Sequence, residues 1–160
     1  MNIDTGALRD ALQAWPGECD DDDKDLAVEK MGDPAFDWIV GQLREGSLSA
    51  KEAVRGLRLL ARLTRQFCVG RKGELLDIAL TISQEIDAAV DVRSTAAHLA
   101  VMNAQIAKGL VHAEAVYGRS VDDVQLQVSG AVGRALELGL TEETEAFVKE
   151  YLRGMVQLPG

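Results

Sequence analysis

Apolar residues recur at helical spacing along almost the whole chain, and no proline interrupts the long periodic segments. The three prolines are Pro16, Pro34 and Pro159. A proline inside a helix removes a backbone donor and clashes with the preceding turn, so this distribution favours helices. Aromatic residues make up only 4% of the chain, and leucine, alanine and valine must therefore supply most of the packing. The pattern predicts an all-α fold with no strand.

About eight helices are expected, and several have clear start signals. Asp33 before Pro34 is typical of an N-cap followed by the first helical position. Ser49 with Glu52 three residues later forms a capping-box pattern. Further N-caps are predicted at Asp91, Ser120 and Thr141. The predicted helices cover approximately residues 5–15, 33–46, 49–70, 73–86, 92–107, 111–117, 120–138 and 142–156.

The composition bounds the class of protein and its compartment. At 160 residues the chain can bury a core without a metal or a disulfide. Cys19 and Cys68 are too few and too far apart to indicate a disulfide framework or a zinc site. No apolar run approaches the roughly 20 residues that span a bilayer, and no secretory signal begins the sequence. We therefore expect a cytoplasmic protein that does not act on membranes.

The second helices of successive predicted pairs look alike. Val54, Val92 and Val124 begin similar segments and are spaced by 38 and 32 residues. Asp91-Val92-Arg93, followed by two alanines and a leucine, resembles the second helix of a HEAT repeat. The resemblance implies a single domain over 1–160 of antiparallel helix pairs stacked as a short HEAT-like α-solenoid. Residues 1–32 would form a divergent acidic N-terminal cap and 33–157 about three helix-pair repeats. An irregular α-helical bundle is the alternative.

Charge is unevenly distributed along the chain. The net charge is −9, with −7 in residues 1–33 and +6 in residues 51–72. Four arginines in the basic stretch recur at spacings of three, four and three, which predicts one helix face opposite the apolar stripe. They either pair with acids of flanking helices or form a patch for an acidic protein, phosphate or nucleic acid. The intramolecular partners considered are Asp37, Glu45, Glu74 and Asp77.

The acidic run between residues 20 and 25 also has two interpretations. It is either a solvated loop or helix N-terminus, or a docking strip for a basic partner. Leu26, Val28 and Met31 follow the run, so its last residues would form a helix N-terminus in the first interpretation. The candidate partner-binding residues are Asp20, Asp21, Asp22, Asp23, Asp25, Arg55, Arg58, Arg62 and Arg65.

No motif for catalysis or for a cofactor was found. His98 and His112 have no His, Cys or carboxylate at a metal-ligand spacing, and we expect His98 to be a structural residue on a helix. The Walker pattern, G-x-S-x-G and the kinase motifs are absent. The sequence therefore predicts no catalytic residue, no metal and no cofactor, and a chain that is not an enzyme. Its negative charge also disfavours nucleic acid as a partner.

These features favour a protein-binding module. Its partner is expected to be another protein, basic and toxin-like, or a second copy of this chain. The most specific hypothesis is a bacterial immunity or antitoxin-type protein that binds and neutralises a basic toxin enzyme, which it resembles in size, charge and helical content only. The second hypothesis is a HEAT-like structural or regulatory scaffold, with a homodimer among its forms. The third is a helical-repeat enzyme or nucleic-acid binder that uses the Arg55–Arg65 row.

Overall fold

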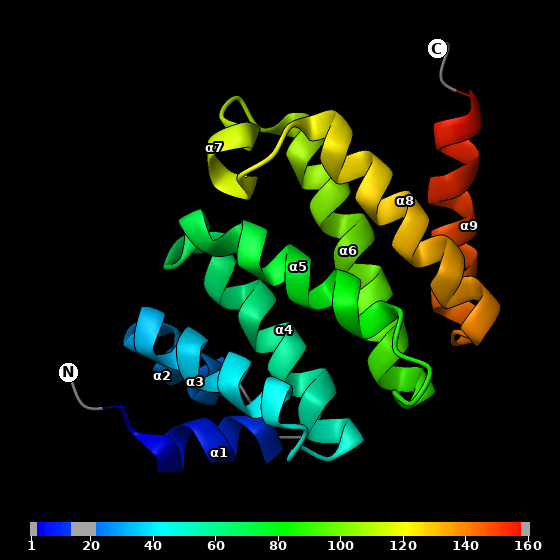
Figure 1. The fold of residues 1–160 in the computed structure, drawn as a ribbon. Coiled ribbons are helices and arrows are strands. Elements are labelled where there is room, and N and C mark those ends of the chain that lie inside the picture. Colours follow the sequence, from blue (N-terminus) through cyan, green and yellow to red (C-terminus); the bar gives the residue numbers. More distant parts are fainter. Residues whose placement is uncertain (1–2, 14–21, 158–160) are drawn as a thin grey trace. The chain divides into compact units, whose positions relative to one another are not determined.

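The computed structural model describes residues 3–13 and 22–157, and these ranges contain nine α-helices, one 3-10 helix and no strand (Figure 1). The predicted all-α class is confirmed. The chain divides into two units, residues 1–69 and 70–160. The helices are α1 (Thr5–Gln13), α2 (Asp22–Met31), α3 (Asp33–Glu45), α4 (Ala50–Gln66), the 3-10 helix η2 (Val69–Arg71), α5 (Lys72–Ser83), α6 (Val90–Gly109), α7 (Ala113–Tyr117), α8 (Val121–Leu138) and α9 (Glu142–Gln157).

Helix α4 is central to unit 1 and packs against α1, α2 and α3. The predicted capping box fixes its start, because the Ser49 hydroxyl accepts from the Glu52 amide at 3.2 Å. The Glu52 carboxylate accepts in return from the Ser49 amide at 3.1 Å. Leu57 and Leu60 of α4 are fully buried, as is Leu8 of α1. Leucine packing around α4 therefore forms the core of this unit.

Helix α6 has the same role in unit 2, where it packs against α5, α7, α8 and α9. Alanines at 96, 100, 104 and 107 are fully buried along it. Small side chains let neighbouring helices approach closely on several sides, so one helix can hold four others. The predicted cap at Ser120 is confirmed, since its hydroxyl accepts from the Asp123 amide at 3.1 Å.

Two predicted N-caps are displaced in the structure. Gly32 is the N-cap of α3 and has a φ of 64°, and Asp33 is the first residue of the helix. Glycine adopts this positive φ without the strain that a Cβ brings. Ala89 is the N-cap of α6, and Asp91 lies within its first turn. Both aspartates still act favourably on the helix dipole from the first turn, although neither caps the helix.

Unit 1 ends at residue 69, and the cap over residues 1–32 and the repeats over residues 33–157 stay predictions. Helices α1 and α2 fall within the predicted cap, yet both pack against α4. The physical reason is that α4 buries leucines of α1 and ion-pairs with carboxylates of α2. Whether the helix pairs form a solenoid stays a prediction.

Two buried tyrosines join the helices of unit 2 through amide side chains. The Tyr117 hydroxyl donates to Asn103 at 2.8 Å, and the Asn103 amide donates to the Leu99 carbonyl at 2.9 Å. A parallel arrangement runs from Tyr151 to Gln125 at 2.8 Å and from there to the Ala104 carbonyl at 2.9 Å. Burial raises the pKa of Tyr117 and of Tyr151 to about 12.

The raised tyrosine pKa values predict that unit 2 loses stability in alkali. A folded-state pKa of about 12 lies above the unfolded value near 10. The stabilisation is therefore complete below pH 10 and is lost as pH rises through 10 to 12, by about 2–3 kcal/mol per tyrosine. Urea unfolding followed by circular dichroism and the absorbance of tyrosinate measure this loss. Tyr151→Phe should reduce the pH dependence by about half; ionisation near pH 10 with an intact fold would contradict the prediction.

Candidate functional site

The two oppositely charged strips identified in the sequence meet inside unit 1. Asp25 of α2 accepts from the Arg55 Nη2 atom at 2.7 Å, and the side chains are only 10% and 8% exposed. Arg55 also donates to the Ala11 carbonyl from Nε at 3.2 Å and from Nη2 at 3.1 Å. Its buried charge is therefore compensated by one carboxylate and by the carbonyl of α1. This pair holds three helices together and is not a solvent-facing docking site.

Arg62 extends the same cluster along α4. Its Nη1 atom lies 3.2 Å from the second oxygen of Asp25, and its Nε atom pairs with Glu29. Glu29 was not identified from the sequence. It lies four residues after Asp25, on the same face of α2, and that spacing was the available signal.

Helical geometry explains why the arginine row does not form a single exposed face. At about 100° per residue, positions seven apart differ by only about 20° around the helix axis. Arg55 and Arg62 therefore share one direction, toward the carboxylates of α2. Arg58 and Arg65 share another, about 60° away, and both are exposed. The prediction that all four lie opposite the apolar stripe was wrong for Arg55, which is buried.

The remaining acidic candidates are only partly described. Asp20 and Asp21 lie outside the described residues. Asp22 and Asp23 lie in the first turn of α2, so the helical alternative holds from residue 22 onward. Asp25 is 7% exposed, which removes it from the set of surface docking residues.

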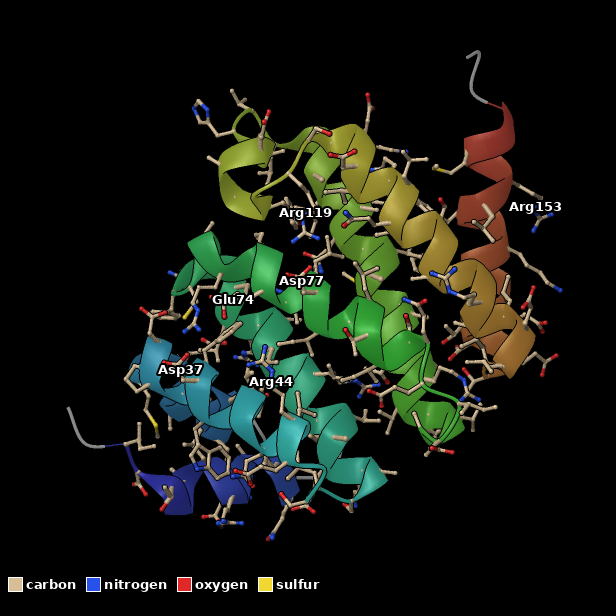
Figure 2. All side chains as sticks on the ribbon, viewed as in Figure 1. Asp37, Arg44, Glu74, Asp77, Arg119 and Arg153 are labelled. Atoms are coloured by element: carbon tan, nitrogen blue, oxygen red, sulfur yellow. The ribbon has the colours of Figure 1, made fainter. Side chains whose placement is uncertain are left out.

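Asp77 and Glu74, two of the acids considered as partners of the arginine row, form ion pairs within unit 2 instead. Figure 2 labels Asp77 on α5 and Arg119, which follows α7; their charged atoms lie 2.8 Å apart. Glu74 pairs with Arg71 at 2.8 Å. Arg55 and Arg62 of the arginine row pair instead with carboxylates of α2, the helix that packs beside α4.

A second charged region lies where the α5–α6 and α8–α9 connections meet in unit 2, and we call it the acidic face. These connections lie near one another on the right of Figure 1. Six exposed carboxylates belong to it, and none forms an ion pair with a described residue. They are Glu85, Asp87, Asp91, Glu137, Glu142 and Glu143.

Arg93 of α6 holds the two connections together. It is 6% exposed and donates to four backbone carbonyls, two in the α5–α6 connection, one at the last residue of α8 and one in the α8–α9 connection. Nη1 binds the carbonyls of Glu85 at 3.2 Å and Ala88 at 3.0 Å. Nε binds Gly139 at 2.8 Å and Nη2 binds Leu138 at 3.2 Å. A guanidinium satisfies carbonyls that a helix end leaves without a partner, so Arg93 fixes the backbone beneath the acidic face.

Ser94 and Gly139 complete this anchor. The Ser94 hydroxyl accepts from the Thr141 amide at 2.8 Å, next to the start of α9. Gly139 has a φ of 110°, a conformation that side-chain-bearing residues rarely adopt. The α8–α9 connection is therefore held at two successive residues of α6.

The acidic face also exposes apolar surface. Ile86, in the α5–α6 connection, is 75% exposed, and Val90, the first residue of α6, is 44% exposed. Ile86 lies between Glu85 and Asp87 in the sequence and Val90 precedes Asp91, so exposed apolar and acidic side chains are neighbours in this segment. Protein–protein interfaces likewise combine apolar contacts with a polar rim.

Helix dipoles favour only half of the six carboxylates. Asp91, Glu142 and Glu143 lie in first turns, where a negative charge stabilises the helix. Glu85 follows the end of α5 and Glu137 is near the end of α8, where a negative charge is unfavourable. Arg93 and the exposed Arg134, which donates to Gln84, reduce the local charge but leave an excess of four negative charges.

The acidic face was missed by sequence reasoning because its residues come from three separated segments. Residues 70–160 hold 13 acids and 8 bases, and that total gives no location. Burial of Lys72 and Arg93 makes the exposed surface more acidic than the total suggests. The available signal in the sequence was the acidic residues that flank the helix connections, together with the apolar Ile86 between two of them.

The predicted structural role of His98 agrees with its position on α6, where its ring lies 4.5 Å from that of Phe147. Among the described residues, no three His, Cys, Asp or Glu side chains are grouped to hold a metal ion. Within the same ranges, no helix is both long enough and apolar enough to cross a bilayer. Comparison of the chain with family models, with curated proteins and with solved structures finds no match.

Proposed function

We propose that this chain is a protein-binding module and that its acidic face binds a basic surface of another protein. The observation that carries the proposal is that six exposed carboxylates form no ion pair with a described residue, and that Ile86 and Val90 are exposed next to three of them in the sequence. A basic partner would neutralise the excess negative charge and cover the apolar centre. The backbone under the face is already fixed by Arg93, so little ordering would accompany binding.

In its most specific form, the proposal is a bacterial immunity or antitoxin-type protein whose partner is a basic toxin enzyme in the cytoplasm. The chain would act by covering the enzyme's site, with no catalysis of its own. Its acidic surface would steer a basic enzyme toward it and speed association at low salt.

We also propose that the helix pairs stack in the HEAT-like manner. The support is local to unit 2: α6 packs against its own pair member α5 and against both members of the next pair, α7 and α8. Arg93 joins the α5–α6 connection to the end of α8. Contacts of each pair with the next are what a stacked repeat requires.

Neutralising the acidic face should release the partner. The test variant carries Glu85→Gln, Asp87→Asn, Glu137→Gln and Glu142→Gln, and the matched control carries Asp10→Asn, Glu45→Gln, Glu114→Gln and Glu150→Gln, all exposed elsewhere. Both change the net charge equally. We expect about 10- to 100-fold weaker binding for the test variant at low salt and little change for the control.

The experiment is affinity purification from cells of the source organism, followed by calorimetry with each purified basic partner. Ile86→Ser should weaken the same complex by about 10-fold, because an apolar contact at the centre is lost. For a toxin enzyme, one equivalent of the chain should also abolish its activity. A basic partner that binds the test variant and the control equally well would place the interface elsewhere and refute the proposal.

A further inference from the structure

Two exposed arginines of α4, Arg58 and Arg65, have no counter-ion among the described residues, and we call them the basic strip. Arg58 and Arg65 are exposed, and neither has an ion pair or hydrogen bond with a described residue. The carboxylates of Asp25 and Glu29 match the charges of Arg55 and Arg62 and leave these two unmatched. Within the described part of the chain, the basic strip therefore carries two positive charges that no carboxylate compensates.

The geometry of the basic strip suits paired carboxylates. Its two residues are seven apart, so they point in nearly the same direction and lie about 10.5 Å apart along the helix axis. Beside Arg65 is a hollow of about 320 Å³, lined also by Glu29, Arg62 and Gln66. A hollow of this size has room for an incoming carboxylate side chain beside Arg65.

Local energetics also leave the strip unsatisfied. Arg58 lies three residues after Arg55 and four before Arg62, and like charges at these spacings destabilise a helix. Phe67, which ends α4, is 45% exposed just beyond Arg65. A partner that brings carboxylates and apolar groups would relieve the repulsion and cover this ring.

We propose that the occupant of the basic strip is a second copy of this chain, which contributes its acidic face. The acidic face carries the complementary features, namely unpaired carboxylates such as Glu85 and Glu137 around the exposed Ile86. Nucleic acid fits poorly, because two arginines on a chain of net charge −9 give few phosphate contacts. The inference uses the acidic face but does not require that a basic partner exists.

The contact joins two different surfaces, so it is heterologous. Such contacts continue from copy to copy unless the geometry closes a ring. Because few charges take part, the association is expected to be weak and to become visible at roughly 100 µM and low salt. A basic partner on the acidic face would compete with it, so partner binding would dissociate the copies.

Charge-reversal variants mixed in pairs test the proposal. The first variant carries Arg58→Glu and Arg65→Glu; the second carries Glu85→Lys and Glu137→Lys, both after or near helix C-termini where lysine is tolerated. The control carries Lys30→Glu and Arg44→Glu, both exposed in unit 1, and Arg44 is labelled in Figure 2. Sedimentation equilibrium at increasing concentration gives the mass of each, and circular dichroism verifies folding.

We expect the wild-type chain and the control to gain mass with concentration at low salt, and to lose that gain at high salt. Each reversal variant alone should stay monomeric. Mixing the two should restore the gain in mass, because the intact acidic face of the first variant meets the intact basic strip of the second and the two reversed surfaces are also complementary in charge. Association that returns only on mixing distinguishes a contact between two copies from a contact within one copy.

A wild-type chain that stays monomeric at all concentrations would overturn the proposal. So would reversal variants that associate like the control, or a mixture that stays monomeric. If the monomer instead binds a labelled polyglutamate peptide through Arg58 and Arg65, the occupant is a different acidic protein and the second copy is excluded. The proposed function is tested separately, because the variant that lacks the basic strip retains the acidic face and its binding to a basic partner can still be measured.

Discussion

Replacing Asp25 with alanine is expected to lower the free energy of unfolding of residues 1–69 by about 3–5 kcal/mol. Asp25 contacts Arg55 at 2.7 Å and Arg62 at 3.2 Å within the interior of unit 1. The variant leaves the Arg55 guanidinium buried, with the Ala11 carbonyl as its remaining partner. A buried charge without its counter-ion is more costly than the absence of the pair, and the predicted loss follows from that asymmetry.

Tryptophan fluorescence during urea unfolding measures this effect in unit 1 alone. Both tryptophans, Trp15 and Trp38, precede residue 70. The exposed Arg58 offers a matched control on the same helix, and Arg58→Ala should change the unfolding free energy by no more than about 0.5 kcal/mol.

The double variant Asp25→Leu with Arg55→Met isolates the pair itself. Both charges are then absent, and we expect at least about half of the stability lost in Asp25→Ala to return. A loss below about 1 kcal/mol for Asp25→Ala would contradict the structural role of the pair. The acidic run would then regain its interpretation as a docking strip.

The comparison of sequence and structure shows which interactions a pattern can reveal. The capping box at Ser49 and Glu52 was predicted correctly, because both partners lie within one helical turn and their chemistry is local. Asp33 failed as a cap because Gly32 takes a positive φ that glycine alone tolerates easily, and the helix starts one residue earlier. The backbone conformation decided between two chemically reasonable starts.

Long-range pairing was beyond the reach of the pattern. The distribution of charge along the sequence distinguished an acidic segment, residues 1–33, from a basic segment, residues 51–72. Asp25 and Arg55 are nevertheless 30 residues apart and meet only when α2 packs on α4. Arg58 and Arg65 could have been separated from Arg55 and Arg62 by their seven-residue spacing. The acidic face could not have been found in this way, because its location depends on how two connections lie beside Arg93.

Replacing Arg93 with methionine is expected to cost unit 2 about 3–5 kcal/mol. Methionine retains the apolar stem but removes all donors to four carbonyls, and each hydrogen bond to a charged donor contributes about 1.5–3 kcal/mol, not all of it additive. Arg93→Lys should recover less than half, because a single ammonium cannot reach carbonyls of both connections as a planar fork does. Arg153→Met is the control, since Arg153 is exposed on α9 (Figure 2) and should change stability by no more than about 0.5 kcal/mol.

Hydrogen exchange shows whether the loss arises at the predicted place. The Thr141 amide is bonded to the Ser94 hydroxyl beside Arg93, and its exchange should accelerate far more than that of the Asp123 amide, which the Ser120 cap holds elsewhere in unit 2. Arg93→Met should also weaken binding of a basic partner, because the backbone beneath the acidic face is no longer fixed, although the substitution increases the excess negative charge of that face. Unaltered Thr141 exchange together with a stability loss below about 1 kcal/mol would show that the two connections hold without Arg93. In that case the rigidity attributed to the acidic face would have to come from helix packing alone.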